Sequence, residues 1–187
     1  MKVLVLDNYD SFTYNLVHIL RELGVDMDIF RNDKISLEAV EDYDKILLSP
    51  GPGLPSEAGI MPELLKRYGS SKSILGVCLG HQAIGECYGG VLYNLPTVFH
   101  GVVTKIQITE SGGLFNTLPE EFNVCRYHSW VIKDANLPSD LIVTSRDELG
   151  TIMSVKHRLH DVQGVQFHPE SIMTEHGKLL IKNWIEG

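Results

Sequence analysis

Cys78 is the residue of this sequence best placed to act as a nucleophile. It lies in the segment Gly76-Val77-Cys78-Leu79-Gly80, between a strand predicted over residues 73–77 and a helix predicted over residues 80–88. Glycines two positions to either side allow the sharp turn of a nucleophile elbow, which raises the side chain above the strand ends. The N-terminus of the following helix favours the negatively charged thiolate. An isolated pattern of this kind also occurs in unreactive turns, so other residues must decide.

A base and an acid follow a strand predicted over residues 162–167. Pro169 disfavours helix for the residue before it, so we expect His168 and Glu170 to lie in an extended chain and to point the same way. A carboxylate that accepts a hydrogen bond from one imidazole nitrogen leaves the other nitrogen to exchange a proton with sulfur. Taken alone, such a histidine is more often structural and such a glutamate a solvated charge. With Cys78 they are predicted to form a catalytic triad for acyl transfer.

A loop rich in glycine and proline, from Ser49 to Gly53, follows a strand predicted over residues 45–49. Its amide groups are not shielded by side chains and are able to point at a developing oxyanion, where one donor is worth about 3 to 4 kcal/mol. Taken by itself, glycine and proline punctuation usually marks only a turn.

The elements that must position these residues alternate along the first half of the chain. Strands are predicted over residues 2–7, 26–31, 45–49 and 73–77, and helices over residues 12–23, 36–42, 61–68 and 80–88. Such repeated units predict a mainly parallel sheet with helices on both faces. Shorter strands follow as antiparallel additions, over residues 102–108, 123–127, 141–145, 151–156 and 162–167, before a closing helix over 178–184. We predict one α/β domain over residues 1–187, with a central, mainly parallel mixed β-sheet flanked by helices.

Composition narrows the class of protein. The chain has 187 residues, 43% of them hydrophobic, which is enough for one well-filled core. A formal net charge of −8, with both signs mixed along the chain, disfavours a nucleic-acid or anionic-membrane partner. Apolar runs are far shorter than the roughly 20 residues that span a bilayer, and the N-terminus enters a strand without a signal-peptide pattern. We therefore expect a cytoplasmic protein.

The three cysteines, Cys78, Cys87 and Cys125, are odd in number and lack the spacing of a disulfide framework or a zinc site. At least one thiol should be free, and no metal site is predicted. Cys87 and Cys125 are expected to be small buried hydrophobic residues. Asp7, at the end of the first strand, and Asp10, just after it, are expected to cap the next helix rather than to bind a metal or phosphoryl group.

Taken together, these motifs resemble the class I, or triad, glutamine amidotransferases. The elbow with Gln82 after it, the loop at residues 51–53 and the terminal His168-Pro169-Glu170 match that family's nucleophile, oxyanion and base segments in order and approximate spacing. The resemblance extends over essentially the whole chain. It implies that Cys78 attacks the side-chain amide of glutamine, that His168 protonates the departing ammonia and later activates water, and that Glu170 orients His168.

The same resemblance implies a binding site for the substrate. The backbone amides of Gly53 and Leu79 would form the oxyanion hole, and glutamine would be bound by Gly51, Pro52, Gly53, Gln82, Ser129 and Trp130. Two positions depart from the family's pattern. Trp130 stands where leucine is common, and Val102 stands where a basic residue is common.

Flanking stretches over residues 7–15, 55–59, 167–171 and 174–177 are similar to the small subunit of anthranilate synthase, in tryptophan biosynthesis, and to its relative in 4-amino-4-deoxychorismate synthase, in folate biosynthesis. This resemblance implies a heteromeric complex in which a chorismate-binding large subunit receives ammonia through a shielded passage. It implies no cofactor in the small subunit, with Mg²⁺ in the partner synthase. Which product is made, and whether one subunit serves both synthases, stays open.

Two other functions compete with this interpretation. A stand-alone thiol hydrolase or peptidase also uses such an elbow, although Gln82 and the loop at residues 51–53 argue against it. A non-catalytic regulatory homologue is disfavoured because all three predicted triad residues are present.

Overall fold

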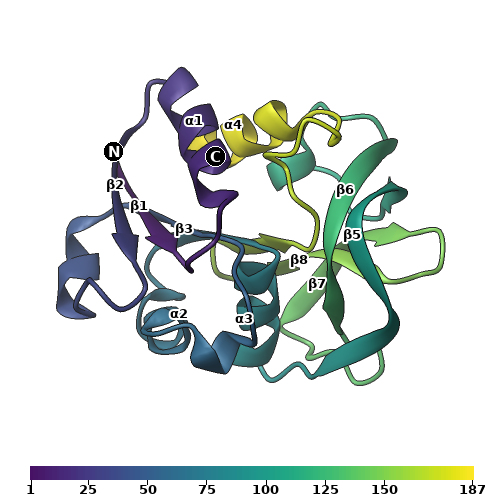
Figure 1. The fold of residues 1–187 in the computed structure, drawn as a ribbon, viewed down its shortest axis with the longest axis horizontal. Helices are drawn as coiled ribbons and strands as arrows, with labels where there is room; N and C mark the ends of the chain where they lie inside the picture. Colours follow the sequence, from purple (N-terminus) through teal and green to yellow (C-terminus); the bar gives the residue numbers. More distant parts are fainter.

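The computed structural model describes residues 1–187 as one nine-stranded sheet with helices on both faces (Figure 1). The strands are β1 (Lys2–Asp7), β2 (Asp26–Arg31), β3 (Lys45–Leu48), β4 (Ser73–Val77), β5 (Leu92–Ile108), β6 (Glu121–Ile132), β7 (Leu141–Asp147), β8 (Ile152–His157) and β9 (Val162–Val165). The α-helices are α1 (Thr13–Glu22), α2 (Met61–Tyr68), α3 (Leu79–Cys87) and α4 (Gly177–Glu186). Short 3₁₀ helices are η1 (Glu38–Asp42), η2 (Pro55–Glu57) and η3 (Gly113–Phe115).

The sheet has a parallel half and an antiparallel half that meet at β9. The strand order is β2-β1-β3-β4-β9-β8-β7-β5-β6, with parallel pairing from β2 to β9 and antiparallel pairing from β9 to β6. The predicted α/β fold with a mixed sheet flanked by helices is confirmed. In the middle of the sheet β4 and β9 are parallel neighbours, and Val77 pairs with Val165. The residues that follow β4 and β9 therefore emerge side by side.

Alternation along the parallel strands separates two hydrophobic cores. Leu4 and Leu6 of β1 pack in the core that includes residues of α2 and α3, whereas Val3 and Val5 pack in the core that includes residues of α1 and α4. All four side chains are fully buried. Figure 1 shows α1 and α4 on one face of the sheet and α2 and α3 on the other. A central strand buried on both faces is apolar at nearly every position, as the sequence of β1 is.

Most predicted elements have the observed bounds to within a few residues, but β5 and β6 are much longer than predicted. The predicted strand over residues 102–108 is too short, because β5 begins at Leu92, and the one over residues 123–127 is too short, because β6 runs from Glu121 to Ile132. Pro96 and Gly101 disfavour a regular strand. The register between β5 and β6 shifts at both places, between Asn94 and Phe99 and between His100 and Val102. The pairing continues around these irregularities.

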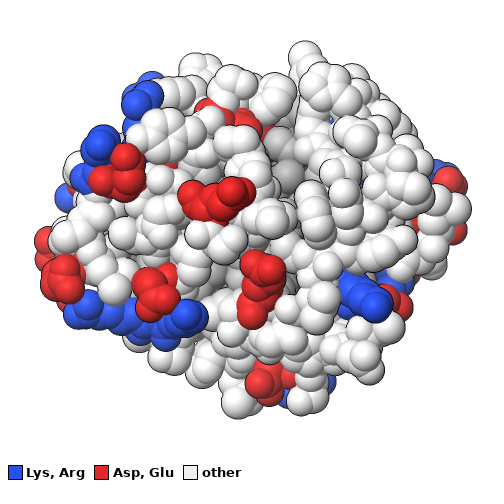
Figure 2. All heavy atoms as spheres, turned by 60° about the horizontal axis from the view of Figure 1, so that its bottom comes forward, with Lys and Arg blue, Asp and Glu red and all other residues white.

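The surface formed by β5 and β6 carries few charges. Figure 2 shows a broad uncharged area on the side of the molecule where β5 and β6 lie in Figure 1. Large apolar side chains exposed on β5 are Tyr93, Val98, Val102 and Val103. An uncharged, partly apolar surface is suited to contact with another protein. Among the helices, none is both long enough and apolar enough to cross a bilayer.

Two glycines of α3 provide a matched test of how closely this helix packs. A Cβ added to Gly80 would lie 2.6 Å from the backbone oxygen of Leu48, whereas one added to Gly85 would meet the movable end of the Ile132 side chain at 2.6 Å. We expect Gly80→Ala to lower the free energy of unfolding by about 1 to 3 kcal/mol. Gly85→Ala should cost less, because the side chain can move and alanine favours the helix by up to about 1 kcal/mol. Urea unfolding measures both; equal losses would contradict the packing assigned to Gly80.

Candidate active site

Cys78 lies in a strained turn between β4 and α3. Its φ is +52°, a value that residues with a side chain rarely adopt. Its amide donates to the Val165 carbonyl at 2.8 Å, which fixes the turn to β9. A Cβ on Gly76 would lie 2.4 Å from the backbone of Gly80, so the turn needs glycine there. The structure therefore places Cys78 at the predicted elbow, at the start of α3 and 6% exposed.

His168 and Glu170 contact each other, but not in the extended chain that the sequence predicts. β9 ends at Val165, and the chain turns at Pro169, with the Ser171 amide donating to the His168 carbonyl at 3.2 Å. The turn brings Glu170 Oε1 to 2.6 Å from His168 Nδ1. The predicted strand over residues 162–167 is too long because the chain must leave the sheet before it can present both side chains.

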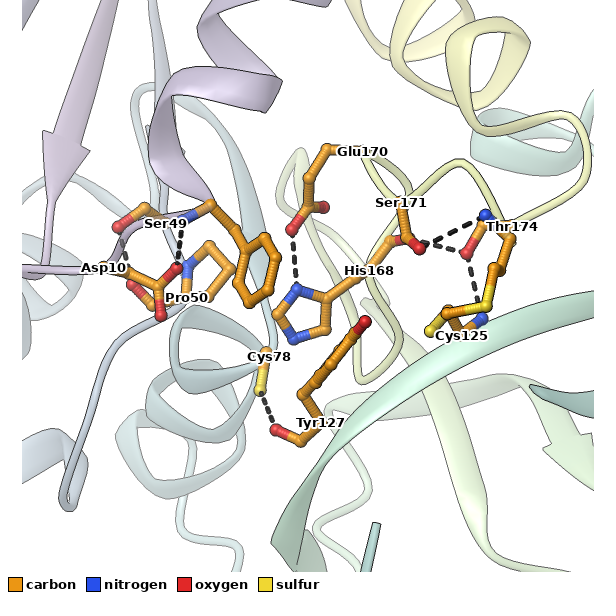
Figure 3. A network of polar contacts seen from close by, with 12 residues as sticks. Asp10, Ser49, Pro50, Cys78, Cys125, Tyr127, His168, Glu170, Ser171 and Thr174 are labelled. Atoms are coloured by element: carbon orange, nitrogen blue, oxygen red, sulfur yellow. Dashed lines mark hydrogen bonds and ion pairs between the residues drawn. The ribbon is translucent and has the colours of Figure 1, made fainter. Parts of the chain in front are cut away.

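The imidazole of His168 lies between the carboxylate and the thiol. Figure 3 shows Glu170, His168 and Cys78 in a row, with Nδ1 toward Glu170 and Nε2 on the side of Cys78. Because a carboxylate only accepts, Nδ1 carries a proton. Burial disfavours the His168 cation, but Cys78 and Glu170 outweigh burial and raise the pKa of His168 above its ordinary value, which favours transfer of the Cys78 proton to the imidazole. Nε2 forms no hydrogen bond in this structure.

Two aromatic side chains cover the imidazole. The ring centroids of Tyr127 and Phe12 lie 5.1 and 5.6 Å from that of His168, and 5.0 Å from each other. His168 is only 2% exposed as a result. The Cys78 thiol donates to the Tyr127 carbonyl at 3.8 Å. Tyr127 therefore contacts both members of the predicted nucleophile and base pair.

Thr174 ties the loop that carries His168 to β6. Its hydroxyl donates to the His168 carbonyl and accepts from the Cys125 amide at 2.9 Å, and the His168 amide donates to the Cys125 carbonyl at 3.0 Å. Thr174 is buried. The position of the imidazole thus depends on β6 as well as on β9.

The loop from Ser49 to Gly53 packs beside the elbow. A Cβ on Gly51 would lie 2.6 Å from Asn8 and 2.8 Å from Leu79, so only glycine allows this approach. Buried Asn8 fixes the loop, since its amide donates to Ser49 Oγ and its Nδ2 to the Ser49 carbonyl, both at 2.8 Å. Gly53 has φ of +73°. The amides of Gly53 and Leu79 donate to no other group of the chain, so both remain available to a ligand.

The predicted glutamine-binding residues of α3 and β6 contact each other. Buried Gln82 donates from Nε2 to the Trp130 carbonyl at 2.9 Å. This hydrogen bond uses the backbone of Trp130, so it does not depend on the tryptophan side chain. Ser129 lies where the β5–β6 register is interrupted, between the pairs Asn94–Trp130 and Phe99–His128. The strand ladder is irregular at the segment expected to face the substrate.

His128 is a buried, neutral histidine beside this segment. Arg126 only donates, and its Nε lies 3.0 Å from His128 Nε2, so the ring proton sits on Nδ1 and donates to the Trp130 carbonyl at 3.1 Å. Arg126 is paired with Asp147 at 2.8 Å, and both side chains are 1% exposed. Burial, followed by the charge of Arg126, lowers the pKa of His128 to about 3. His128 therefore acts as a neutral donor.

The remaining predicted residues lie outside this cluster. Asp7 accepts from the Thr13 hydroxyl at 3.0 Å and Asp10 from the Phe12 amide at 2.7 Å, both at the start of α1. Neither carboxylate accepts from an amide in the first turn of α1, whose N-cap is Phe12, so the expected capping role is not confirmed. All three cysteines are free, as the prediction of at least one free thiol requires. Cys125 is buried, whereas Cys87 is only partly buried.

Sequence analysis missed several residues that the structure brings to the predicted triad or to the Trp130 segment beside it. These are Phe12, Arg126, Tyr127, His128, Gln166 and Thr174. Gln166 is fully buried directly after β9 and donates from Nε2 to Cys78 Sγ at 3.7 Å. A polar residue within an apolar strand sequence, two positions before His168, was the one signal that pointed to it.

Comparisons with known proteins agree with this geometry. The model of the family described as glutamine amidotransferase class-I matches residues 4–186. Anthranilate synthase component 2 of Thermus thermophilus is 49% identical over 191 residues, which cover 100% of this chain and 92% of that protein. Aminodeoxychorismate/anthranilate synthase component 2 of Bacillus subtilis is 42% identical, covering 98% of this chain and 95% of that protein. A Thermoplasma acidophilum crystal structure, provisionally described as one of the subunits of GMP synthase, matches with a TM-score of 0.89 at 29% identity, covering 100% of this chain and 92% of that one.

The Thr174 hydroxyl offers a test of the loop anchor. Thr174→Val keeps the size of the side chain but leaves the Cys125 amide and the His168 carbonyl without this partner. A buried polar group without a partner costs about 1 to 3 kcal/mol, so we expect the free energy of unfolding to fall by about 2 kcal/mol in urea. Thr174→Ser retains the hydroxyl and should stay within about 1 kcal/mol of wild type. Equal losses in the two variants would show that the hydroxyl is not the anchor.

Burial of neutral His128 predicts acid sensitivity. Below about pH 6.5 the unfolded chain binds a proton at this residue that the folded chain refuses until about pH 3. Stability should therefore fall with decreasing pH in this window, by up to about 1.4 kcal/mol per pH unit for His128. His128→Gln should show a slope shallower by that amount in urea unfolding between about pH 4 and pH 6. His18→Gln, at an exposed site, should keep the wild-type slope; parallel curves for all three proteins would refute the assignment.

Proposed function

The chain belongs to the class-I glutamine amidotransferase family, and we propose that it is the glutaminase subunit of anthranilate synthase. The observation that carries the proposal is the placement of Cys78 at a strained elbow beside His168, whose Nδ1 is held by Glu170 at 2.6 Å. Full-length relatives named anthranilate synthase component 2, such as the Thermus thermophilus protein at 49% identity, support the choice of synthase.

Aminodeoxychorismate synthase is the alternative partner enzyme. The Bacillus subtilis relative carries both names, as an aminodeoxychorismate/anthranilate synthase component 2. The name of this relative therefore assigns a single small subunit to both synthases. In either case the reaction at the triad is the same, and the large subunit determines the product.

In the proposed reaction the Cys78 proton passes to His168, and the thiolate attacks the side-chain amide carbon of glutamine. The electron pair of the carbonyl moves to its oxygen, which accepts hydrogen bonds from the Gly53 and Leu79 amides. His168 gives its proton to the nitrogen, the carbon–nitrogen bond breaks, and ammonia leaves a thioester on Cys78. Water that gives a proton to His168 then attacks the thioester, and glutamate leaves as the thiol is restored.

The substrate is proposed to lie between α3, β6 and the loop of residues 51–53. Gln82 and the backbone of Ser129 and Trp130 would bind the amino-acid end of glutamine, and Gly51, Pro52 and Gly53 would border its amide. The Gln82 contact to the Trp130 carbonyl supports this, since it joins two of these elements beside Cys78. The proposed reaction needs no cofactor in this subunit, and Mg²⁺ is assigned to the partner synthase.

A partner is part of the proposal because ammonia released into water at neutral pH is mostly protonated and no longer nucleophilic. The chorismate-binding large subunit would receive ammonia directly. Exposed apolar side chains beside the triad support such docking: Ile172 is fully exposed and Met173 is 39% exposed, in a groove that Phe12, Tyr127 and Glu170 also line. Apolar surface next to a reactive site is suited to cover by a protein.

The proposal is tested with Cys78→Ala mixed with chorismate and the cognate large subunit. Glutamine-dependent formation of the aromatic amine should fall by about 10³-fold or more, while formation from ammonium salts should stay at the wild-type level. Cys87→Ala, the matched control, should keep both activities. Spectroscopic identification of the amine separates anthranilate from aminodeoxychorismate. Glutamine-dependent activity that survives in Cys78→Ala, or a large subunit that does not bind this chain, would refute the proposal.

A further inference from the structure

Gln166 lies between the thiol and the predicted substrate-binding residues and has no role in the reaction described above. Its side chain is fully buried. Nε2 lies 3.7 Å from Cys78 Sγ, and Oε1 accepts from Gln82 Nε2 at 3.4 Å. The residue therefore joins the nucleophile to a neighbouring amide, and its effect depends on which end faces the sulfur.

The contacts of Gln82 determine that orientation. The Trp130 carbonyl only accepts, so Gln82 must turn its NH₂ group toward it, at 2.9 Å. The second hydrogen of the same NH₂ group is directed to an acceptor on Gln166, which must be Oε1. The NH₂ group of Gln166 is then left to face Cys78. Reversing either amide would bring two oxygens or two NH₂ groups together.

The Trp130 carbonyl, which orients Gln82, also accepts a hydrogen bond from a second donor. His128 Nδ1 donates to the same Trp130 carbonyl at 3.1 Å, and its tautomer is fixed by Arg126 at 3.0 Å. Arg126 is held in turn by buried Asp147 at 2.8 Å. The carbonyl that orients Gln82 is thus held from both sides by buried groups, although the β5–β6 ladder is irregular next to it.

We propose that Gln166 is a catalytic residue that stabilises the Cys78 thiolate through its amide N–H, and that Gln82 and His128 are positioning residues acting through it. The inference rests on the proposed glutaminase function. In the step concerned, the thiol proton moves to His168 Nε2, the electron pair stays on sulfur, and Gln166 keeps both of its hydrogens. A donor stabilises the charged form more than the neutral one.

The second contact of the sulfur acts in the opposite direction. The Tyr127 carbonyl accepts from the thiol at 3.8 Å and is favourable only while the sulfur carries its proton. After ionisation the carbonyl oxygen faces a negative sulfur, whereas the Gln166 N–H contact becomes stronger. Of these two contacts, Gln166 favours the reactive form and Tyr127 favours the resting form.

The test is a titration of the Cys78 thiolate by its ultraviolet absorbance, with the signal of Cys78→Ala subtracted. In Gln166→Met, which has similar volume and no donor, the midpoint should move up by about one pH unit. Gln163→Met carries the same substitution on β9, where the amide contacts Asp161, and should keep the wild-type midpoint. An unchanged midpoint in Gln166→Met would overturn the proposal. The titration needs neither glutamine nor the large subunit, so it is independent of the proposed function.

A second variant covers the case in which Gln166→Met does not fold, as judged by circular dichroism. Gln82→Met removes the orienting amide, so Gln166 becomes free to turn its oxygen toward sulfur, and the midpoint should again rise. A wild-type midpoint in that variant would overturn the proposal. If glutaminase activity is present, kcat of Gln166→Met should fall by about tenfold with little change in KM. A change in KM alone would assign Gln166 to substrate binding instead.

Discussion

The turn at Cys78 is the constraint on which the rest of the site depends. A side chain at φ of +52° is held there because β4 meets α3 without room for a Cβ at Gly76, and α3 meets β3 without room for a Cβ at Gly80. The same close approach places the thiol at the start of α3, where the helix dipole favours negative charge. It also fixes the Cys78 amide to the Val165 carbonyl of β9. The strand that leads to His168 is thereby placed beside the predicted nucleophile.

The buried pair of Cys78 and His168 also contacts groups that the parallel half of the sheet does not supply. The antiparallel half provides them from β6, whose Tyr127 and Trp130 carbonyls contact Cys78 and Gln82. β6 is an edge strand of the sheet, and its register with β5 breaks next to Ser129. Where the β5–β6 pairing is interrupted, hydrogen bonds from buried side chains hold the backbone of β6 instead. The core strands therefore position the predicted nucleophile, and the edge strand β6 supplies contacts around it.

The parts of the structure that were predictable from sequence are those that depend on local pattern. β4 and the elbow at Cys78 follow from an apolar run bounded by glycines, and the pairing of His168 with Glu170 follows from their spacing, although a turn rather than a strand brings them together. Contacts between distant segments left no local pattern. Tyr127 belongs to an ordinary strand sequence, and only the β5–β6 pairing and the fold of the sheet bring its ring and carbonyl to the triad.

The predicted triad is buried, whereas the residues available to a partner lie on the surface beside it. This separation explains why similar folds can serve different reactions. The Thermoplasma acidophilum structure, provisionally described as belonging to GMP synthase, has a TM-score of 0.89 to this chain at only 29% identity. A triad that releases ammonia from glutamine places no requirement on the molecule that finally accepts the ammonia. Selection of that acceptor must therefore lie with the partner and the surface that binds it. Exposed Ile172 lies beside the predicted triad and outside its hydrogen bonds, so a change there would alter this surface and leave those contacts in place.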